Sequence, residues 1–245
     1  AITAVILTGC SADDDFLKRK PTNAFPDEDT WRNESLIYSN LADLYVRYND
    51  YQSTQTWYTY CDFEEGYSAA VVDQSRHKKS TYGYAEWASW DYGYIRHLNL
   101  FIEKCSAAAD EVFVNHTRDR LVAEARFLRA AYYFELAKRM GGVPLVTESL
   151  TYDYSGDPTY LQHPRKKEHE IYDFVLAELE GIKNALPDDA NVKSRATKAA
   201  ALAIRSRAAL YAGSIAKYGA LRTPTVKTDG WEVGIPATMA DGYYK

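Results

Sequence analysis

Apolar side chains recur every three or four residues over most of the chain, a spacing that places them on one face of an α-helix. The pattern predicts five helices, at about 27–48, 87–105, 117–140, 168–186 and 194–218. The third stretch shows it most clearly, with a stripe formed by Leu121, Ala125, Leu128, Tyr132 and Leu136. Residues 240–245 have the composition of the start of a sixth helix.

Capping residues and helix breakers set the expected ends of these helices. Asp27 or Asp29 can cap the first helix and Ser194 the fifth. The third helix is followed by two glycines, with Pro144 beyond them, which is a strong stop signal. Three stretches show no clear period and are expected to be loops: 49–84, 143–165 and 219–236. The sequence therefore predicts a mainly α fold with long irregular loops.

A short internal repeat suggests how these helices are arranged. The pattern Arg-Ala-Ala-x-Tyr occurs twice, starting 78 residues apart at Arg129 and Arg207. That distance equals two units of about 39 residues, within the range of helical repeats. Helix pairs of this kind stack because each pair buries a face that it cannot bury alone. We predict tetratricopeptide-like repeats, an α-α superhelix.

Composition and motifs exclude several classes of function. The 245 residues are 46% hydrophobic and 26% charged, as in an ordinary folded domain, and the net charge is −5. Because there is no basic stripe, a nucleic-acid partner is not expected. Motifs of serine hydrolases, zinc proteases and nucleotide-binding loops do not occur in the sequence. We predict neither an enzyme nor a protein that needs a cofactor or metal.

The N-terminal residues resemble a lipoprotein export signal. Residues 1–7 are an apolar run too short to cross a bilayer, and Leu-Thr-Gly-Cys at 7–10 resembles a bacterial lipobox. The alternative is a buried N-terminal strand with a chance cysteine. The first interpretation predicts the remainder of a signal peptide at 1–9, lipid on Cys10, and a tether at 10–26. Acidic residues 13–15 then resemble the surface-export signal of some Gram-negative lipoproteins.

Two further cysteines, Cys61 and Cys105, leave a choice open. They can pair in an oxidising compartment or remain two separate buried thiols. The sequence favours separate thiols without excluding the disulfide.

An aromatic-rich segment is the candidate binding surface. Residues 45–94 contain 14 aromatics in 50 positions, against 14% for the whole chain. A sugar ring can rest its C–H face on an aromatic ring while polar side chains bind its hydroxyls. Our candidates for the aromatic platform are Trp57, Tyr58, Tyr67 and Tyr82, and the candidate polar partners are Asp62, Asp73 and Arg76. Some of these aromatics can instead pack against helices.

A glycoside hydrolase is the competing interpretation of this segment. Asp62, Glu64 and Glu65 could supply paired carboxylates, but neighbours in a loop do not define the separation that hydrolysis requires.

Several ordered motifs resemble the SusD/RagB family of nutrient-uptake lipoproteins. The main one is residues 124–136 followed by Gly-Gly-Val-Pro-Leu at 141–145. The lipobox precedes it, and the other matches, in chain order, lie at 16–21, 94–101 and 195–198 through 210–214. Together they cover nearly the whole chain.

The resemblance implies a lipoprotein held at the surface of the Gram-negative outer membrane. It would capture an oligosaccharide, or in some members a peptide, and deliver it to a TonB-dependent SusC-like transporter. Family members are typically about twice this length. We therefore expect residues 27–245 to be the N-terminal helical domain, truncated at its C-terminus. A tetratricopeptide-like scaffold that binds only protein is the alternative.

Overall fold

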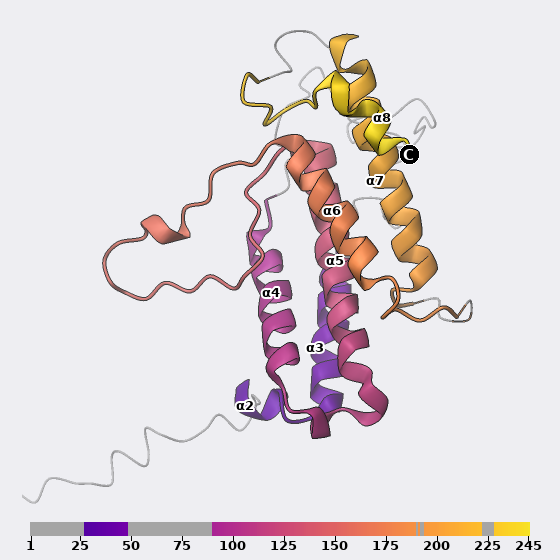
Figure 1. Cartoon of the computed structure of the whole chain (residues 1–245). Coiled ribbons are helices and arrows are strands. Elements are labelled where there is room, and N and C mark those ends of the chain that lie inside the picture. Colours follow the sequence, from indigo (N-terminus) through magenta and orange to yellow (C-terminus); the bar gives the residue numbers. More distant parts are fainter. Residues whose placement is uncertain (1–26, 49–89, 190, 192–193, 222–227) are drawn as a thin grey trace, which may run out of the picture.

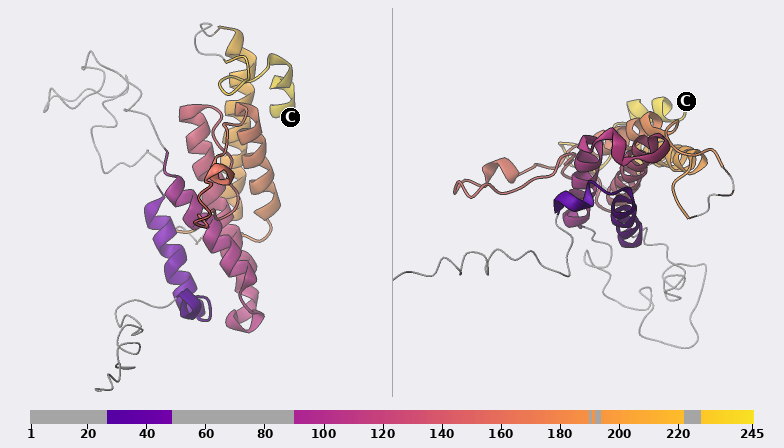
Figure 2. Two further views of the ribbon diagram at one scale, coloured as in Figure 1. Left: turned by 90° about the vertical axis from the view of Figure 1, so that its left-hand side faces the viewer. Right: turned by 90° about the horizontal axis from the view of Figure 1, so that it is seen from below.

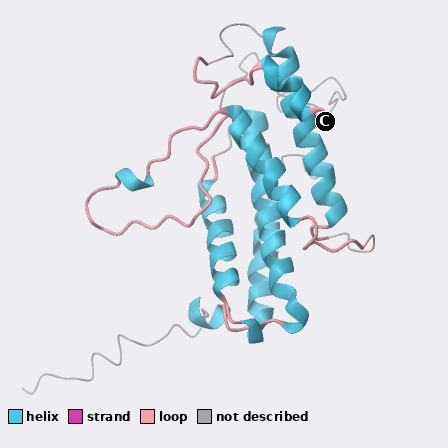
Figure 3. Ribbon diagram, in the orientation of Figure 1, coloured by secondary structure: helices cyan, strands magenta, loops and turns pink. Residues whose placement is uncertain are grey.

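The computed structural model describes residues 27–48, 90–189, 191, 194–221 and 228–245 (Figure 1). These residues form α-helices, short 3₁₀ turns and loops, and no strand occurs among them (Figure 3). The α-helices are α2 (Asp27–Thr30), α3 (Glu34–Arg47), α4 (Tyr92–Ala107), α5 (Thr117–Met140), α6 (Glu168–Ile182), α7 (Lys198–Tyr218) and α8 (Ala240–Tyr243). The 3₁₀ turns are η4 (Asp110–Val112), η5 (Val114–His116), η6 (Thr159–Leu161), η7 (Gly219–Leu221) and η9 (Ala237–Met239). The prediction of a mainly α fold is confirmed.

Each long helix packs on the next one along the chain. The pairs α3–α4, α4–α5, α5–α6 and α6–α7 are all in contact, and α3 also reaches α5. Successive helices run in opposite directions, as Figures 1 and 2 show. This succession of antiparallel helix pairs is the tetratricopeptide-like superhelix that the sequence predicted. Within the described residues, no helix has both the length and the hydrophobicity needed to cross a bilayer.

Helix starts differ from the expected ones because several residues in each stretch can act as a cap. The predicted first helix is broken into α2 and α3, and the Asn33 side chain caps α3 by accepting from the N–H of Ser35 at 2.9 Å. Asp91 caps α4 by accepting from the N–H of Tyr94, so that helix begins at Tyr92 and not at 87. The sequence contains the possible caps, but only the packed chain selects among them.

The fifth predicted helix also starts later, and the fourth ends earlier, than expected. Thr197, and not Ser194, caps α7 by accepting from the N–H of Ala200 at 3.1 Å. Helix α6 ends at Ile182, where a turn follows before Pro187. Helix α5 has the predicted bounds.

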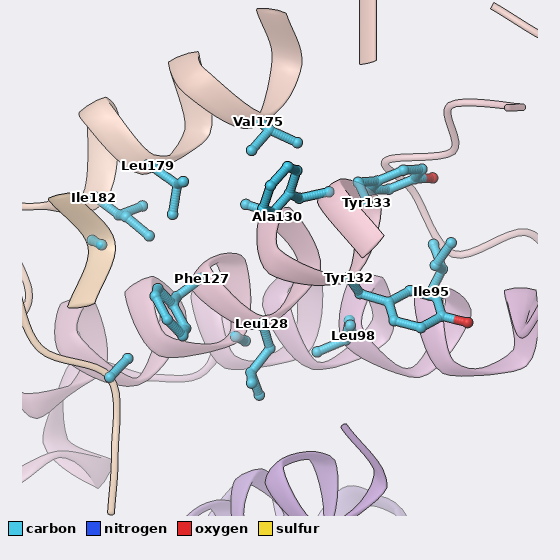
Figure 4. Close-up of a cluster of buried hydrophobic side chains, with 14 of the residues drawn as sticks. Ile95, Leu98, Phe127, Leu128, Ala130, Tyr132, Tyr133, Val175, Leu179 and Ile182 are labelled. Carbon is cyan, nitrogen blue, oxygen red and sulfur yellow. The ribbon is translucent and has the colours of Figure 1, made fainter. Parts of the chain in front are cut away.

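The core lies around α5, between α4 and α6 (Figure 4). All five residues of the predicted stripe are buried, and the stripe is thereby confirmed. The opposite side of the helix is buried too, because Tyr133 and Phe134 pack toward α6. A one-sided stripe therefore underestimates the burial of a helix that has neighbours on two sides.

The two copies of the internal repeat occupy different environments. Arg129 on α5 is 5% exposed and Tyr133 is fully buried. At the matching positions of α7, Arg207 is exposed and Tyr211 is 43% exposed. The repeat thus marks two helices of the same array, while the contacts of each copy depend on its neighbours.

Cys105, near the end of α4, is a free and fully buried thiol. Burial raises its pKa to about 12, although the charge of Arg118 acts in the opposite direction.

Because the thiolate is the reactive form, we expect Cys105 to resist alkylation at pH 8 in the folded protein and to react on unfolding. The measurement is iodoacetamide labelling followed by peptide mass spectrometry. Rapid labelling of Cys105 in the native protein would contradict the packing of α4. Cys61 lies outside the described residues.

Candidate ligand-binding site

The residues that the sequence proposes as ligand contacts lie outside the described part of the structure. These are the platform residues Trp57, Tyr58, Tyr67 and Tyr82 and the polar residues Asp62, Asp73 and Arg76. The proposed lipidation site, Cys10, also lies outside it. These assignments remain predictions. The structure adds information at the two described ends of the aromatic-rich segment, residues 45–48 and 90–94.

Two tyrosines of that segment hold helices together. The Tyr94 side chain is buried, its ring meets Tyr132 edge to face, and its hydroxyl donates to the carbonyl of Leu44 at 2.8 Å. The Tyr45 hydroxyl donates to Glu124 at 2.8 Å. Burial raises the pKa of both tyrosines. These two rings therefore contribute to packing, which is the alternative that the sequence left open for part of the segment.

Trp90 and Tyr92 form an aromatic pair at the start of α4. Their rings stack with centroids 6.3 Å apart and an interplanar angle of 19°. Trp90 is 38% exposed, and the guanidinium of Arg165 lies over its ring at 5.9 Å. The Tyr92 hydroxyl donates to the carbonyl of Pro144 at 2.7 Å, and burial raises its pKa. This pair connects the aromatic segment to the loop that follows α5.

A pocket of about 400 Å³ lies beside this pair, between α4 and the loop that joins α5 to α6. The loop extends away from the helices in Figures 1 and 2. The pocket is lined by Tyr92, Ile95 and Arg96 of α4 and by Pro144, Val146, Glu148, Leu150, Tyr152, Leu161 and His163 of the loop. Its volume falls in the range of small-molecule sites, where apolar walls carry a few polar groups.

Buried polar side chains hold the first part of this loop against the helices. The amide of Asn99 donates to the carbonyls of Val146 and Glu148 at 3.0 and 2.9 Å. The Tyr133 hydroxyl accepts from the N–H of Val146 at 2.8 Å and donates to its carbonyl at 3.1 Å. Burial raises the pKa of Tyr133 to about 12, so this hydroxyl stays protonated at physiological pH. The pocket wall at 144–148 is therefore fixed by α4 and α5.

A charged cluster behind this wall orients Asn99. Arg129 donates to the Asn99 side-chain oxygen at 2.8 Å and to Glu178 of α6 at 3.0 Å. Arg126 binds the same carboxylate through two bonds, of 3.0 and 2.8 Å. Burial acts to raise the pKa of Glu178, but the two arginines outweigh it and hold that pKa below its usual range. Three helices thus set the position of the pocket wall.

Tyrosine hydroxyls brace the outer part of the loop. Tyr160 donates to the carbonyl of Thr151 at 3.0 Å and accepts from the N–H of Asp153 at 2.7 Å. Tyr152 accepts from the N–H of Gly156 at 3.0 Å. Apart from η6, the loop has no regular secondary structure to pair its backbone, and these hydroxyls supply hydrogen-bond partners for some of its N–H and C=O groups. These contacts fix Tyr152 as one side of the pocket.

The polar groups of the pocket are few and of different kinds. Arg96 donates through Nε to the carbonyl of Leu150 at 3.0 Å. Glu148 is exposed at the rim. The Nε2 atom of His163 is enclosed and has no hydrogen-bond partner in the described part of the chain. An enclosed polar atom without a partner in the protein is uncommon, and this one is closed to solvent as well.

Sequence reasoning did not single out His163, Arg96 or Tyr152. One signal was available: residues 143–165 form a long loop punctuated by three prolines, and such a loop in a compact domain is usually functional. The lining side chains come from two segments about 50 residues apart. Only the fold brings them together.

A protein-family model described as "Starch-binding associating with outer membrane", the SusD-like type, matches residues 15–210. The SusD-like protein P38 of Formosa agariphila is 26% identical over 189 residues, which cover 73% of this chain and 35% of that protein.

Solved structures agree with this match. A SusD-like protein from Bacteroides fragilis is 28% identical, with a TM-score of 0.54 over 80% of this chain and 38% of that one. A laminarin-binding SusD-like protein, at 21% identity, shares the fold with a TM-score of 0.52 over 74% of this chain and 41% of that one. The chain thus spans little more than a third of the length of the first of these relatives. The family match covers most of the chain, and the helical order agrees with it: this chain belongs to the SusD-like family.

Proposed function

We propose that this protein is a cell-surface glycan-binding lipoprotein that captures an oligosaccharide and delivers it to a TonB-dependent SusC-like transporter. The family match over residues 15–210 is the observation that carries the proposal. A fold alone does not imply a function, so the proposal also draws on the site. The aromatic pair Trp90–Tyr92 belongs to the aromatic-rich segment and adjoins the pocket, in agreement with a surface suited to sugar rings.

The pocket favours binding over glycoside hydrolysis. Hydrolysis by the common mechanisms needs two carboxyl groups facing each other across the scissile bond. Among the residues that line the described pocket, Glu148 is the one carboxylate. The proposed role is therefore capture without turnover.

The assignments proposed for the N-terminal residues are consistent with a surface-anchored binding protein. Lipid on Cys10 and a tether over 10–26 would anchor the body to the outer membrane and leave it free to reach a transporter. Residues 27–245 are then the helical domain. In this arrangement the superhelix acts as a scaffold for the transporter, and the loops provide the ligand contacts.

Affinity gels separate the three candidate functions. The full-length protein would be run through native gels containing soluble starch or laminarin, with and without a co-expressed transporter. Slower migration in a polysaccharide gel supports the proposal. Release of sugar from the gel would identify an enzyme instead. Association with the transporter and no retardation by any glycan would identify a scaffold that binds only protein.

Replacing Trp57 or Tyr67 with alanine is expected to weaken glycan binding about tenfold or more, because each change removes a ring on which a sugar can stack. Affinity of the full-length protein for the retained polysaccharide, measured by calorimetry, checks this. Tyr218→Ala is the matched control, since Tyr218 is a 53% exposed tyrosine on α7. Unchanged affinity in both Trp57→Ala and Tyr67→Ala would overturn the assignment of the platform.

A further inference from the structure

The walls of the pocket beside α4 are mostly carbon. The apolar part of the lining consists of five aliphatic residues and two tyrosines: Ile95, Pro144, Val146, Leu150, Leu161, Tyr92 and Tyr152. An unsubstituted hexose carries a hydroxyl at nearly every ring position. Each hydroxyl pressed against carbon would lose its water without gaining a partner, which costs free energy. A ligand for this pocket therefore needs an apolar group as well as polar ones.

The polar groups of the pocket suit a neutral group that both donates and accepts hydrogen bonds, as an amide does. Arg96 can only donate hydrogen bonds, ionised Glu148 can only accept them, and the imidazole of His163 can do either. A carboxylate ligand would face Glu148 as a like charge and Arg96 as an opposite charge, so the charges of the pocket do not select an acidic sugar.

We propose that this pocket binds the acetamido group of an N-acetylated amino sugar. The methyl group would lie against the carbon walls, and the amide oxygen and N–H would bind the donors and acceptor named above. The inference rests on the proposed glycan binding and adds a ligand class and a position to it. The position lies between α4 and the loop after α5.

Chitotetraose and cellotetraose form a matched pair of probes, since both are β-1,4-linked and they differ in the acetamido group at C2. Binding of each to the full-length protein would be measured by calorimetry. We expect chitotetraose to bind about tenfold more tightly, the difference that one buried methyl group and one added hydrogen bond supply. Equal affinities, or tighter binding of cellotetraose, would overturn the inference.

Two variants then place the preference in this pocket. Leu161→Trp fills the pocket from the surface loop and should abolish the preference for chitotetraose. His163→Ala removes an imidazole that lines the pocket and should weaken chitotetraose binding about fivefold. His97→Ala is the control, because His97 lies exposed on α4 and does not line the pocket. Thermal unfolding of each variant confirms that it folds.

The possible failures can be told apart. If polysaccharides are retained in the affinity gels but the two tetrasaccharides bind alike, only the acetamido inference fails. If chitotetraose binds tightly and neither variant changes its affinity, the assignment to this pocket fails. If no glycan of any kind is bound, the proposed function fails and the inference fails with it.

Discussion

Replacing Glu124 with alanine is expected to lower the free energy of unfolding by about 3 kcal/mol, because it removes a buried carboxylate and leaves its basic partners without a counter-charge. Glu124 is 0% exposed on α5. Its carboxylate accepts from the Tyr45 hydroxyl at 2.8 Å, from Arg120 Nε at 3.0 Å and from Arg195 Nε at 2.7 Å. Tyr45 in turn accepts from the N–H of Ala196 at 2.8 Å. One carboxylate thus ties α3 and the start of α7 to α5.

Removing this carboxylate leaves Arg195 facing a buried tyrosine hydroxyl without a counter-charge. The side chains of Arg120 and Arg195 are 34% and 25% exposed, so water can compensate only in part. The two changes should be non-additive. The double variant Glu124→Ala/Arg195→Ala should lose less free energy of unfolding than the sum of the losses in the two single variants. Denaturant unfolding followed by circular dichroism measures each free energy.

Glu180→Ala is the matched control for this prediction. Glu180 is also a helical glutamate that pairs with two basic residues, Lys183 and Arg205, but its side chain is 45% exposed. Solvent-exposed pairs of this kind contribute little to the free energy of unfolding. Similar losses in Glu124→Ala and Glu180→Ala would show that burial of Glu124 adds nothing to stability.

Gly142→Ala should also destabilise the protein strongly, by about 3 kcal/mol. A Cβ atom at residue 142 would lie 1.9 Å from the carbonyl oxygen of Lys166 and 3.0 Å from the nitrogen of Glu168. Both are backbone atoms, so a side-chain rotation cannot relieve the overlap. The backbone of residue 142 is also fixed from both sides, because its N–H donates to the backbone carbonyl of Glu232 at 2.5 Å and its own carbonyl accepts from Arg165 Nε at 2.7 Å.

The control for this change is Gly242→Ala in α8. A Cβ atom there meets nothing within 4 Å, and alanine is the better helix former. We expect Gly242→Ala to be neutral or to stabilise by up to about 1 kcal/mol. A loss below about 1 kcal/mol for Gly142→Ala would show that the connection from α5 to α6 can move apart, against the tight backbone contact described above.

The sequence predicted the helices well where the apolar period was long and the end signals were strong. Helix α5 has its predicted bounds, since it continues for more than six turns and stops at two glycines. Prediction was weaker where several residues could cap a helix. Asn33, Asp91 and Thr197 act as the caps, and nearby acidic or hydroxyl side chains had equal claims from sequence alone.

The candidate site was less accessible to sequence reasoning than the fold. The aromatic-rich segment stands out by composition, but composition cannot separate a packing ring from an exposed one. Tyr45 and Tyr94 hold helices together, whereas Trp90 is partly exposed beside a pocket. The helix period and the composition each describe one segment of the chain at a time. The pocket is formed by two segments, so neither pattern reveals it.

The helical architecture, the approximate helix positions and the resemblance to the family can be predicted from the sequence, because the helix period and end signals are local and the motifs are contiguous. The tertiary structure sets which polar residues meet. The Glu124 carboxylate binds Arg195, which lies 71 residues further along the chain. The Asn99 amide donates to loop carbonyls 47 and 49 residues away. The tertiary structure also sets where the pocket beside α4 lies, because its walls depend on a loop held by those buried polar contacts.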